Sequence, residues 1–120
     1  MSDDLNAYDD LLSELRDDED VEGIVFGGWG WSYGTDELGY GEPDPPIVPF
    51  DKRGVVMSLD RARPLMAGWS FYGSYGAPTC YAVTAWTNER VLWVTQYDGS
   101  TGLSSAERNP KDYWPDMPGG

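Results

Sequence analysis

Histidine is absent from this 120-residue chain, and cysteine occurs once, at Cys80. Without imidazole the chain can build no Ser-His-Asp or Cys-His catalytic centre and no zinc site that needs histidine ligands. One thiol can form neither an intrachain disulfide nor a metal cage of thiolates. The sequence therefore predicts no catalytic residues, no bound metal and no cofactor. We expect Cys80 to be a small buried side chain in a reducing compartment.

Positive charge is also scarce. Eight lysines and arginines stand against 21 aspartates and glutamates, which gives a net charge of −13. Residues 1–22 carry ten of the acids and Arg16 alone, a net of −9, and the rest of the chain carries the remaining −4. Phosphate groups are bound by basic surfaces, so this balance disfavours direct binding to nucleic acid or to acidic membrane lipids.

Long apolar runs are missing as well. No run approaches the roughly 20 residues of a membrane span, and the first four residues, Met-Ser-Asp-Asp, lack the basic and apolar parts of a signal peptide. We therefore expect a soluble, cytoplasmic protein. Hydrophobic residues make up 40% of the chain, which suffices for one core at this length, so we expect a single domain over residues 1–120.

Apolar residues recur at helical spacing near the N-terminus and predict an amphipathic helix over residues 4–16, within an acidic segment that spans residues 1–20. Its apolar stripe consists of Leu5, Tyr8, Leu11, Leu12 and Leu15. A side chain among residues 2–4 can cap the first amides. The acidic run at residues 17–20 lies at the negative end of the helix dipole and should fray the last turn.

The clearest β pattern covers residues 79–106 and predicts an antiparallel meander. Residues 79–87 and 90–97 are rich in β-branched and aromatic side chains and are joined by Asn88-Glu89. Asp98-Gly99 is a strong signal for a second hairpin, and a two-residue loop there places Leu103 opposite Val94. One face of this meander is the expected core face, and it comprises Tyr81, Val83, Ala85, Leu92 and Val94.

Shorter signals predict the remaining segments. Residues 21–26 and 54–57 favour strands, whereas four prolines make residues 35–49 an irregular loop. Ser58 should cap a short helix over residues 59–66, in which Pro64 keeps the second half irregular. The tail at 110–120 lacks an apolar period, and Tyr113 and Trp114 can pin it across the sheet.

These elements together predict an α+β fold. We expect an antiparallel meander sheet of four to five strands, with the N-terminal amphipathic helix and the short second helix packed on the aliphatic face.

Several runs carry a resemblance to a known family. They are Gly68-Trp69-Ser70-Phe71, Tyr75-Gly76-Ala77-Pro78, Trp86-Thr87-Asn88, Gln96-Tyr97-Asp98-Gly99-Ser100-Thr101 and Arg108-Asn109-Pro110. Over residues 21–120 the chain resembles a family of small uncharacterised proteins of bacteria, archaea and their viruses. The resemblance implies that the aromatic and glycine-rich passages belong to one folded unit, and it brings no catalytic residues with it.

The acidic N-terminal segment is the first candidate for a binding site. Asp3, Asp10, Glu14 and Asp17 lie largely opposite the apolar stripe of the expected helix. Such a row of carboxylates can imitate a phosphate backbone and occupy a basic groove on a nucleic-acid-binding protein. The simpler interpretation is a solvated helix face, and salt adaptation would also produce an acidic composition.

Aromatic side chains form the second candidate. Partner or ligand binding is expected at Trp29, Trp31, Tyr33, Trp86 and Trp93, because exposed tryptophan and tyrosine mark interaction hot spots. The alternative is that these rings form a second small core beneath the proline-rich loop.

The functional expectation is binding rather than catalysis. We expect a small acidic interaction protein that engages a basic, nucleic-acid-binding partner, of the kind that anti-CRISPR inhibitors of viruses and mobile elements represent. The alternative is a cellular domain that binds a small ligand on its aromatic face, with its acidity due to salt adaptation.

Overall fold

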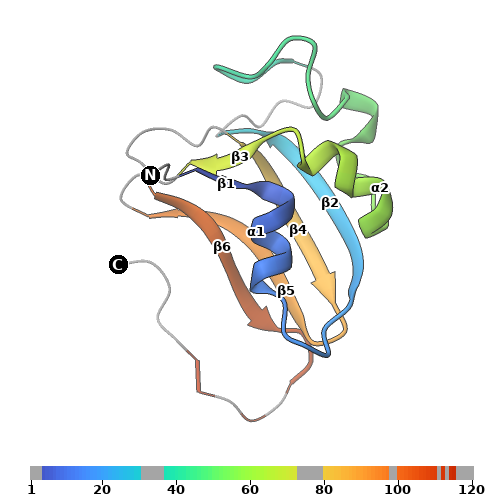
Figure 1. Cartoon of the computed structure of the whole chain (residues 1–120), viewed down its shortest axis with the longest axis vertical. Coiled ribbons are helices and arrows are strands. Elements are labelled where there is room, and N and C mark those ends of the chain that lie inside the picture. Colours follow the sequence, from blue (N-terminus) through green and yellow to red (C-terminus); the bar gives the residue numbers. More distant parts are fainter. Residues whose placement is uncertain are drawn as a thin grey trace.

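A four-stranded antiparallel sheet is the centre of the molecule. In the computed structural model the described residues are 4–30, 37–72, 80–97, 100–110, 112, 114 and 115. The strands β2 (Val21–Trp29), β4 (Tyr81–Thr87), β5 (Arg90–Tyr97) and β6 (Ser100–Glu107) follow the order β2-β4-β5-β6 (Figure 1). With two α-helices beside it, the sheet confirms the predicted α+β fold.

The register of the meander follows the predicted turns. Ala85 pairs with Leu92 across β4 and β5, and Val94 pairs with Leu103 across β5 and β6. Tyr97 pairs with Ser100, so two residues connect β5 to β6; these two lie outside the described residues. Alternation of apolar and polar side chains fixes this register, because a slip by one residue would turn the aliphatic face outward.

The N-terminal helix is shorter than predicted at both ends. Helix α1 spans Ala7–Glu14, and Asp4–Asn6 is instead the strand β1. β1 pairs with β3 (Ser70–Tyr72) in a separate two-stranded antiparallel sheet. The cap is Asn6, whose side-chain oxygen accepts hydrogen bonds from the amides of residues 8 and 9. The predicted N-terminal helix is confirmed, but its predicted start was wrong, because pairing with the distant β3 takes residues 4–6 out of the helix.

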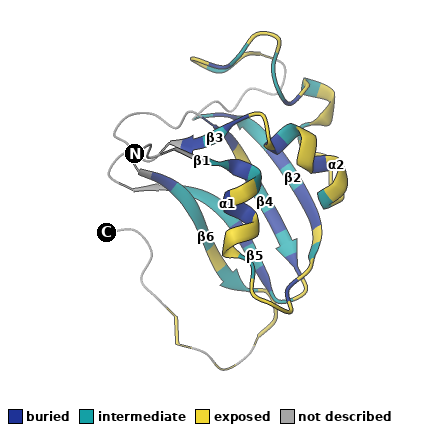
Figure 2. Ribbon diagram, in the orientation of Figure 1, coloured by how far each residue is buried: buried dark blue, intermediate teal, exposed yellow. Residues whose placement is uncertain are grey.

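Both helices contribute to one core on the aliphatic face of the sheet. Helix α2 spans Leu59–Met66 and is capped by Ser58 as predicted. The dark blue bands in Figure 2 show that the buried residues lie between the helices and the sheet. The core comprises Ala7, Leu11, Ile24, Phe26, Trp29, Val48, Met57, Ala62, Met66, Trp69, Phe71, Cys80, Tyr81, Val83, Ala85 and Leu92, with Val94 and Leu103 partly buried against it.

Three shorter predictions are corrected by the structure. Residues 54–57 form no strand, but Met57 makes a single antiparallel bridge to Ile24 at the free edge of β2. Helix α2 continues through Pro64 to Met66, because burial of Ala62 and Met66 outweighs the one backbone hydrogen bond that proline removes. Trp114 is almost fully exposed and does not pin the tail across the sheet; Tyr113 lies outside the described residues.

The proline-rich loop is irregular, as predicted. Its described part, residues 37–49, contains a cis peptide bond between Asp44 and Pro45, and a short 3-10 helix, Phe50–Lys52, follows it. The described residues contain no helix that is both long enough and apolar enough to cross a membrane.

Candidate binding surface

Asp10 does not lie on the acidic surface where the sequence placed it. Its side chain is only 9% exposed, on the same helix face as Ala7 and Leu11. These positions are three and four residues apart, so they share one face of α1, and this face packs on the core, whereas Leu12 of the predicted apolar stripe is 40% exposed. Burial, reinforced by the negative charge of Glu14, raises the pKa of Asp10. The prediction that Asp10 contacts a partner is therefore wrong.

The exposed acids gather instead where α1 ends and the chain turns toward β2. Glu14 and Asp17 are exposed as predicted, and Asp18 and Asp20 join them. We call these four residues the acidic end; it is the lower end of Figure 1. Within the described part of the chain, none of these four carboxylates pairs with a cation. Asp3 lies outside the described residues.

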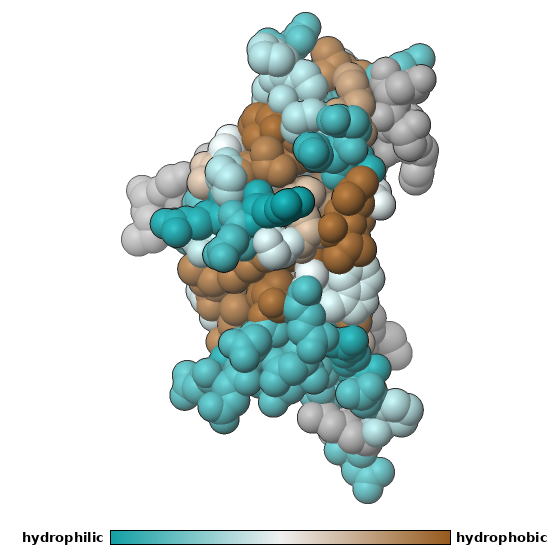
Figure 3. Space-filling view, turned by 90° about the vertical axis from the view of Figure 1, so that its right-hand side faces the viewer, coloured by the Kyte–Doolittle hydropathy of each residue, from teal (hydrophilic) through white to brown (hydrophobic). Residues whose placement is uncertain are grey.

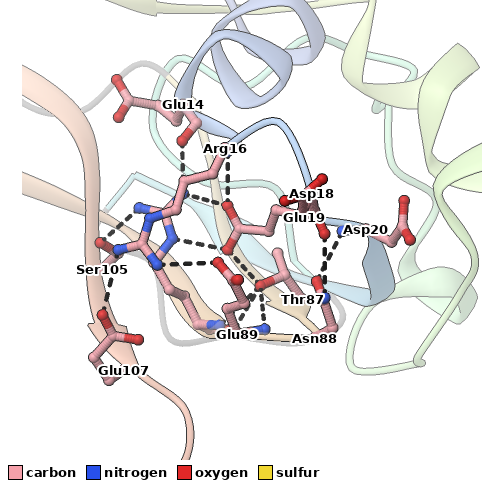
Figure 4. A network of polar contacts seen from close by, with 11 residues as sticks. Glu14, Arg16, Asp18, Glu19, Asp20, Thr87, Asn88, Glu89, Ser105 and Glu107 are labelled. Atoms are coloured by element: carbon pink, nitrogen blue, oxygen red, sulfur yellow. Dashed lines mark hydrogen bonds and ion pairs between the residues drawn. The ribbon is translucent and has the colours of Figure 1, made fainter. Parts of the chain in front are cut away.

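A buried ion pair positions this turn. The carboxylate of Glu19 accepts hydrogen bonds from Arg90 Nε at 2.8 Å and Arg90 Nη2 at 2.6 Å, and from the hydroxyl of Thr87 at 2.5 Å (Figure 4). Arg90 also donates to the Glu14 carbonyl and to Ser105 Oγ, so all three of its side-chain nitrogens are bonded. The Arg90 guanidinium lowers the pKa of Glu19 to about 2, against a usual 4.5.

The side chain of Asn88 also fixes this turn to the β4–β5 hairpin. Asn88 accepts a hydrogen bond from the Asp20 amide at 2.9 Å and donates to the Asp18 carbonyl at 3.2 Å (Figure 4). The backbone groups of residues 18 and 20 are therefore held while their carboxylates project into solvent. The acidic end is thus a preorganised surface, which reduces the entropy lost on binding.

The arginines near the acidic end are already occupied by carboxylates of the chain itself. Arg16 bridges Glu89 and Glu107 at 3.1 and 3.3 Å, and Arg108 pairs with Glu22. Since these cations are neutralised locally, they do not offset the charge of the four exposed acids. On the face that Figure 3 shows, hydrophilic residues gather at the lower end, and hydrophobic patches lie above them.

The predicted aromatic site is divided between the core and the other face of the sheet. Trp29 is 6% exposed, and its ring meets Tyr81 edge to face with centroids 4.9 Å apart, so its assignment to a binding surface was wrong. β2 is longer than predicted and carries Trp29 into the core. Trp86 and Trp93 are partly exposed on the face opposite the helices. Trp31 and Tyr33 lie outside the described residues.

A shallow groove of about 290 Å³ lies on that second face, next to the acidic end. It is lined by Glu22, Gly23, Val56, Trp86 and Arg108. Across β2 and β4, Val21 pairs with Thr87 but Gly23 pairs with Trp86, so Glu22 is the extra residue of a β-bulge. Bulges redirect side chains at sheet edges. Of the three members of the predicted aromatic set that the structure describes, only Trp86 lines this groove.

A second buried ion pair lies at the opposite end of the molecule. Arg53 pairs with Glu42, which also accepts a hydrogen bond from the Tyr81 hydroxyl at 2.7 Å. The same hydroxyl accepts from the amides of Ile47 and Val48, so the proline-rich loop is tied to β4. Burial, followed by the hydrogen bond to Glu42, raises the pKa of Tyr81. These groups are sealed by the loop and form a structural contact rather than an accessible site.

Catalytic and metal chemistry find no support in the described residues. They contain no group of three or more carboxylates or thiols arranged to hold a metal ion. Cys80 is buried, which confirms its predicted place in the core, and burial raises the pKa of its thiol to about 12. Such a thiol is not a nucleophile at neutral pH.

Sequence reasoning missed both ion pairs and the groove. One signal was present for Arg90, since it has the same strand parity as Leu92 and Val94 and so had to lie on the core face. A charged residue there requires a buried partner. The bulge at Glu22 had no comparable signal, because it arises from pairing between β2 and β4, about 60 residues apart.

No family model matches the chain, and no curated protein or solved structure matches it. The resemblance to a family of small proteins therefore stays a prediction, and the function has to be argued from the surface alone.

Proposed function

We propose that this chain is a protein-interaction module that binds a basic partner through its acidic end. The observation that carries the proposal is the pairing pattern there: the nearby arginines are held by other carboxylates, while Glu14, Asp17, Asp18 and Asp20 are exposed and unpaired within the described residues. Negative charge that is fixed in position and not neutralised steers a positively charged partner and sets its orientation.

The narrower form of the proposal is inhibition of a nucleic-acid-binding machine, as anti-CRISPR proteins do. Exposed carboxylates on a turn that is held in place suit a groove that otherwise binds phosphates. In this form the protein acts in the cytoplasm, where a single unpaired thiol is stable in its reduced state. Nucleic acid should then compete with the chain for its partner. If the chain instead bound the partner outside its nucleic-acid groove, added nucleic acid would not change the binding.

Charge substitution with a matched control tests the proposal. One variant changes Glu14, Asp17, Asp18 and Asp20 to their amides, and the control changes four exposed acids outside the acidic end, Glu37, Asp44, Asp51 and Asp60. Both variants lose the same charge, so they differ only in where it is lost. Neither set contacts the core, and both proteins should fold.

The measurement is the association rate with a partner that wild-type protein retains at low salt. At about 0.1 M salt, where the Debye length is about 10 Å, we expect the acidic-end variant to associate roughly tenfold more slowly than the control variant. At about 1 M salt the difference should vanish, and dissociation should change little at either salt. Equal association rates for the two variants would overturn the proposal.

A second candidate function is ligand binding on the aromatic face. The groove beside Trp86 favours it, but its volume of about 290 Å³ is at the lower limit for sites that enclose drug-sized molecules. A groove of this shape suits one side chain of a partner better than a separate ligand.

A further inference from the structure

We infer that the groove beside Trp86 is a pocket for one arginine side chain of the basic partner, and that Arg108 blocks the carboxylate of this pocket in the free protein. The inference rests on the proposed function in taking the partner to be basic. It adds a second contact point, on the sheet face next to the acidic end, and it names the side chain that fits there.

The polar part of the groove already binds a guanidinium. Arg108 Nη1 donates to the carboxylate of Glu22 and, at 2.8 Å, to the backbone carbonyl of Thr87. A guanidinium presents several donors in one plane, so a carboxylate and a carbonyl that both accept at one point match its chemistry. The bulge creates this pair of acceptors, because it places the extra residue Glu22 between the positions that pair with Thr87 and Trp86.

The interactions that hold Arg108 in this position are weak. Both of its side-chain hydrogen bonds come from Nη1, and both Arg108 and Glu22 are partly exposed. The buried Arg90, by contrast, donates from three nitrogens. Exposed ion pairs contribute little net stability because water and salt compete with them. An incoming arginine can therefore displace Arg108, which would swing into solvent.

The apolar part of the groove suits the rest of an arginine side chain. Trp86 forms one wall and Val56, which is 65% exposed, forms another. Gly23 keeps the floor at backbone level, since a Cβ atom there would lie 2.9 Å from Val56 Cγ1. Arginine packs its methylene stem along apolar surface and stacks its planar head on indole. Lysine offers the stem but not the planar head.

Charge decides which occupant is expected. The net charge of −13 repels a second copy of this chain and any anionic ligand. The neighbouring acidic end attracts a basic segment, whose arginine would then find Glu22 and Trp86 within the same approach. The occupant is therefore an arginine of the partner rather than an apolar side chain, because only a guanidinium can use the two acceptors, Glu22 and the Thr87 carbonyl, that Arg108 now occupies.

The test uses two fluorescein-labelled peptides, one alternating arginine with glycine and one alternating lysine with glycine, of equal length and charge. Binding is followed by fluorescence anisotropy at about 0.1 M salt, where charge attraction still operates. The pocket predicts that wild-type protein binds the arginine peptide about two- to fivefold more tightly than the lysine peptide, the range expected for an exposed cation–π contact. Trp86→Leu should abolish this preference.

The second part of the test removes Arg108, the arginine of the chain that pairs with Glu22. Arg108→Gln frees Glu22 and should strengthen binding of the arginine peptide about threefold more than Arg61→Gln does, a matched loss of charge on the exposed side of α2. Glu22→Gln should weaken it more than Glu37→Gln does. Folding of each variant is checked by its melting temperature, which these exposed positions should change little.

The outcomes separate the pocket from the proposed function. If the acidic end alone binds, Arg108→Gln and Arg61→Gln behave alike and arginine is not preferred, which overturns the pocket. If the acidic-end variant loses affinity for both peptides but keeps the preference for arginine, both proposals stand. If it loses no more affinity than its control variant while the preference persists, the proposed function fails and the pocket stands. Failure of both peptides to bind overturns the pocket.

Discussion

Two buried carboxylate–guanidinium pairs hold irregular segments to opposite ends of one sheet, and they differ in how completely their polar atoms are bonded. Glu19–Arg90 ties the turn after α1 to the β4–β5 hairpin, and each side-chain nitrogen of Arg90 has an acceptor. In Glu42–Arg53 the Nη1 atom of Arg53 is buried without an acceptor among the described residues.

This difference in hydrogen bonding determines how much each ion pair can stabilise the fold. Removing charges from water costs free energy that attraction recovers only when the remaining donors and acceptors are also bonded. The Arg90 site meets that condition, whereas the Arg53 site carries the cost of one unbonded donor. Arg53 offsets part of it by lying over the rings of Phe50 and Tyr81, at 4.3 and 5.1 Å from their centroids. We therefore expect the Arg90 pair to stabilise the fold more.

Arg90→Met should give the largest loss of stability. It leaves the Glu19 carboxylate buried without a cation, which costs about 3–5 kcal/mol of unfolding free energy. Chemical denaturation of wild type and variant measures it. The double variant Glu19→Gln/Arg90→Met should recover most of the loss, because an uncharged amide can still accept from Thr87. If the double variant is as unstable as the single one, packing of the arginine and not its charge holds the turn.

Acidification should produce the next largest effect. The pKa of Glu19 is lowered to about 2 in the folded protein and is near 4.5 when unfolded. Its contribution is therefore complete above pH 4.5 and is lost as the pH falls from 4.5 toward 2, up to about 3 kcal/mol. Asp10, whose pKa is raised, acts in the opposite direction. Glu19→Gln should flatten the fall in unfolding free energy over this range, and an unchanged pH profile in that variant would refute the assignment.

The double variant Arg53→Met/Glu42→Gln should give the smallest of the three effects, about 1–2 kcal/mol, because it leaves no buried charge without a partner and also removes the unbonded donor. The opening should be local, since Arg53 holds the proline-rich loop rather than the sheet. Hydrogen exchange at the amides of Ile47 and Val48, which donate to Tyr81, should accelerate more than exchange within β4 and β5. A loss equal to that of Arg90→Met would remove the distinction between the two ends.

Contacts between neighbouring segments of the chain could be predicted from the sequence, whereas contacts between distant segments could not. Strand alternation and the two-residue turns determine the meander, because its partners are neighbours along the chain. The pairing of Leu5 with Phe71 is not encoded in either segment alone, and it moved the start of α1 to Ala7. In the helix that forms, the face with Ala7, Asp10 and Leu11 is buried, whereas burial of the predicted stripe would have left Asp10 exposed.

The exposure of the candidate acidic residues was only partly predictable. An acidic N-terminal segment suggested a binding surface, and Glu14 and Asp17 are exposed as predicted. Ten acids in residues 1–22 offered many partners for Arg90, and nothing in their order singles out Glu19. Trp29 and Trp86 look equivalent in sequence, but a register shift between Phe26 and Trp29 turns Trp29 into the core, whereas Trp86 alternates with buried Ala85 and lies beside the groove.

The bridge at Met57 has a consequence for self-association. β2 is an edge strand, and its free backbone groups could pair with an edge strand of another molecule. The Ile24 amide and carbonyl are instead bonded to Met57 at 2.8 and 2.9 Å, and the Phe26 carbonyl accepts from the Gly54 amide at 2.8 Å. The short segment at residues 54–57 thus occupies backbone groups of this edge that could otherwise pair with a strand of another molecule.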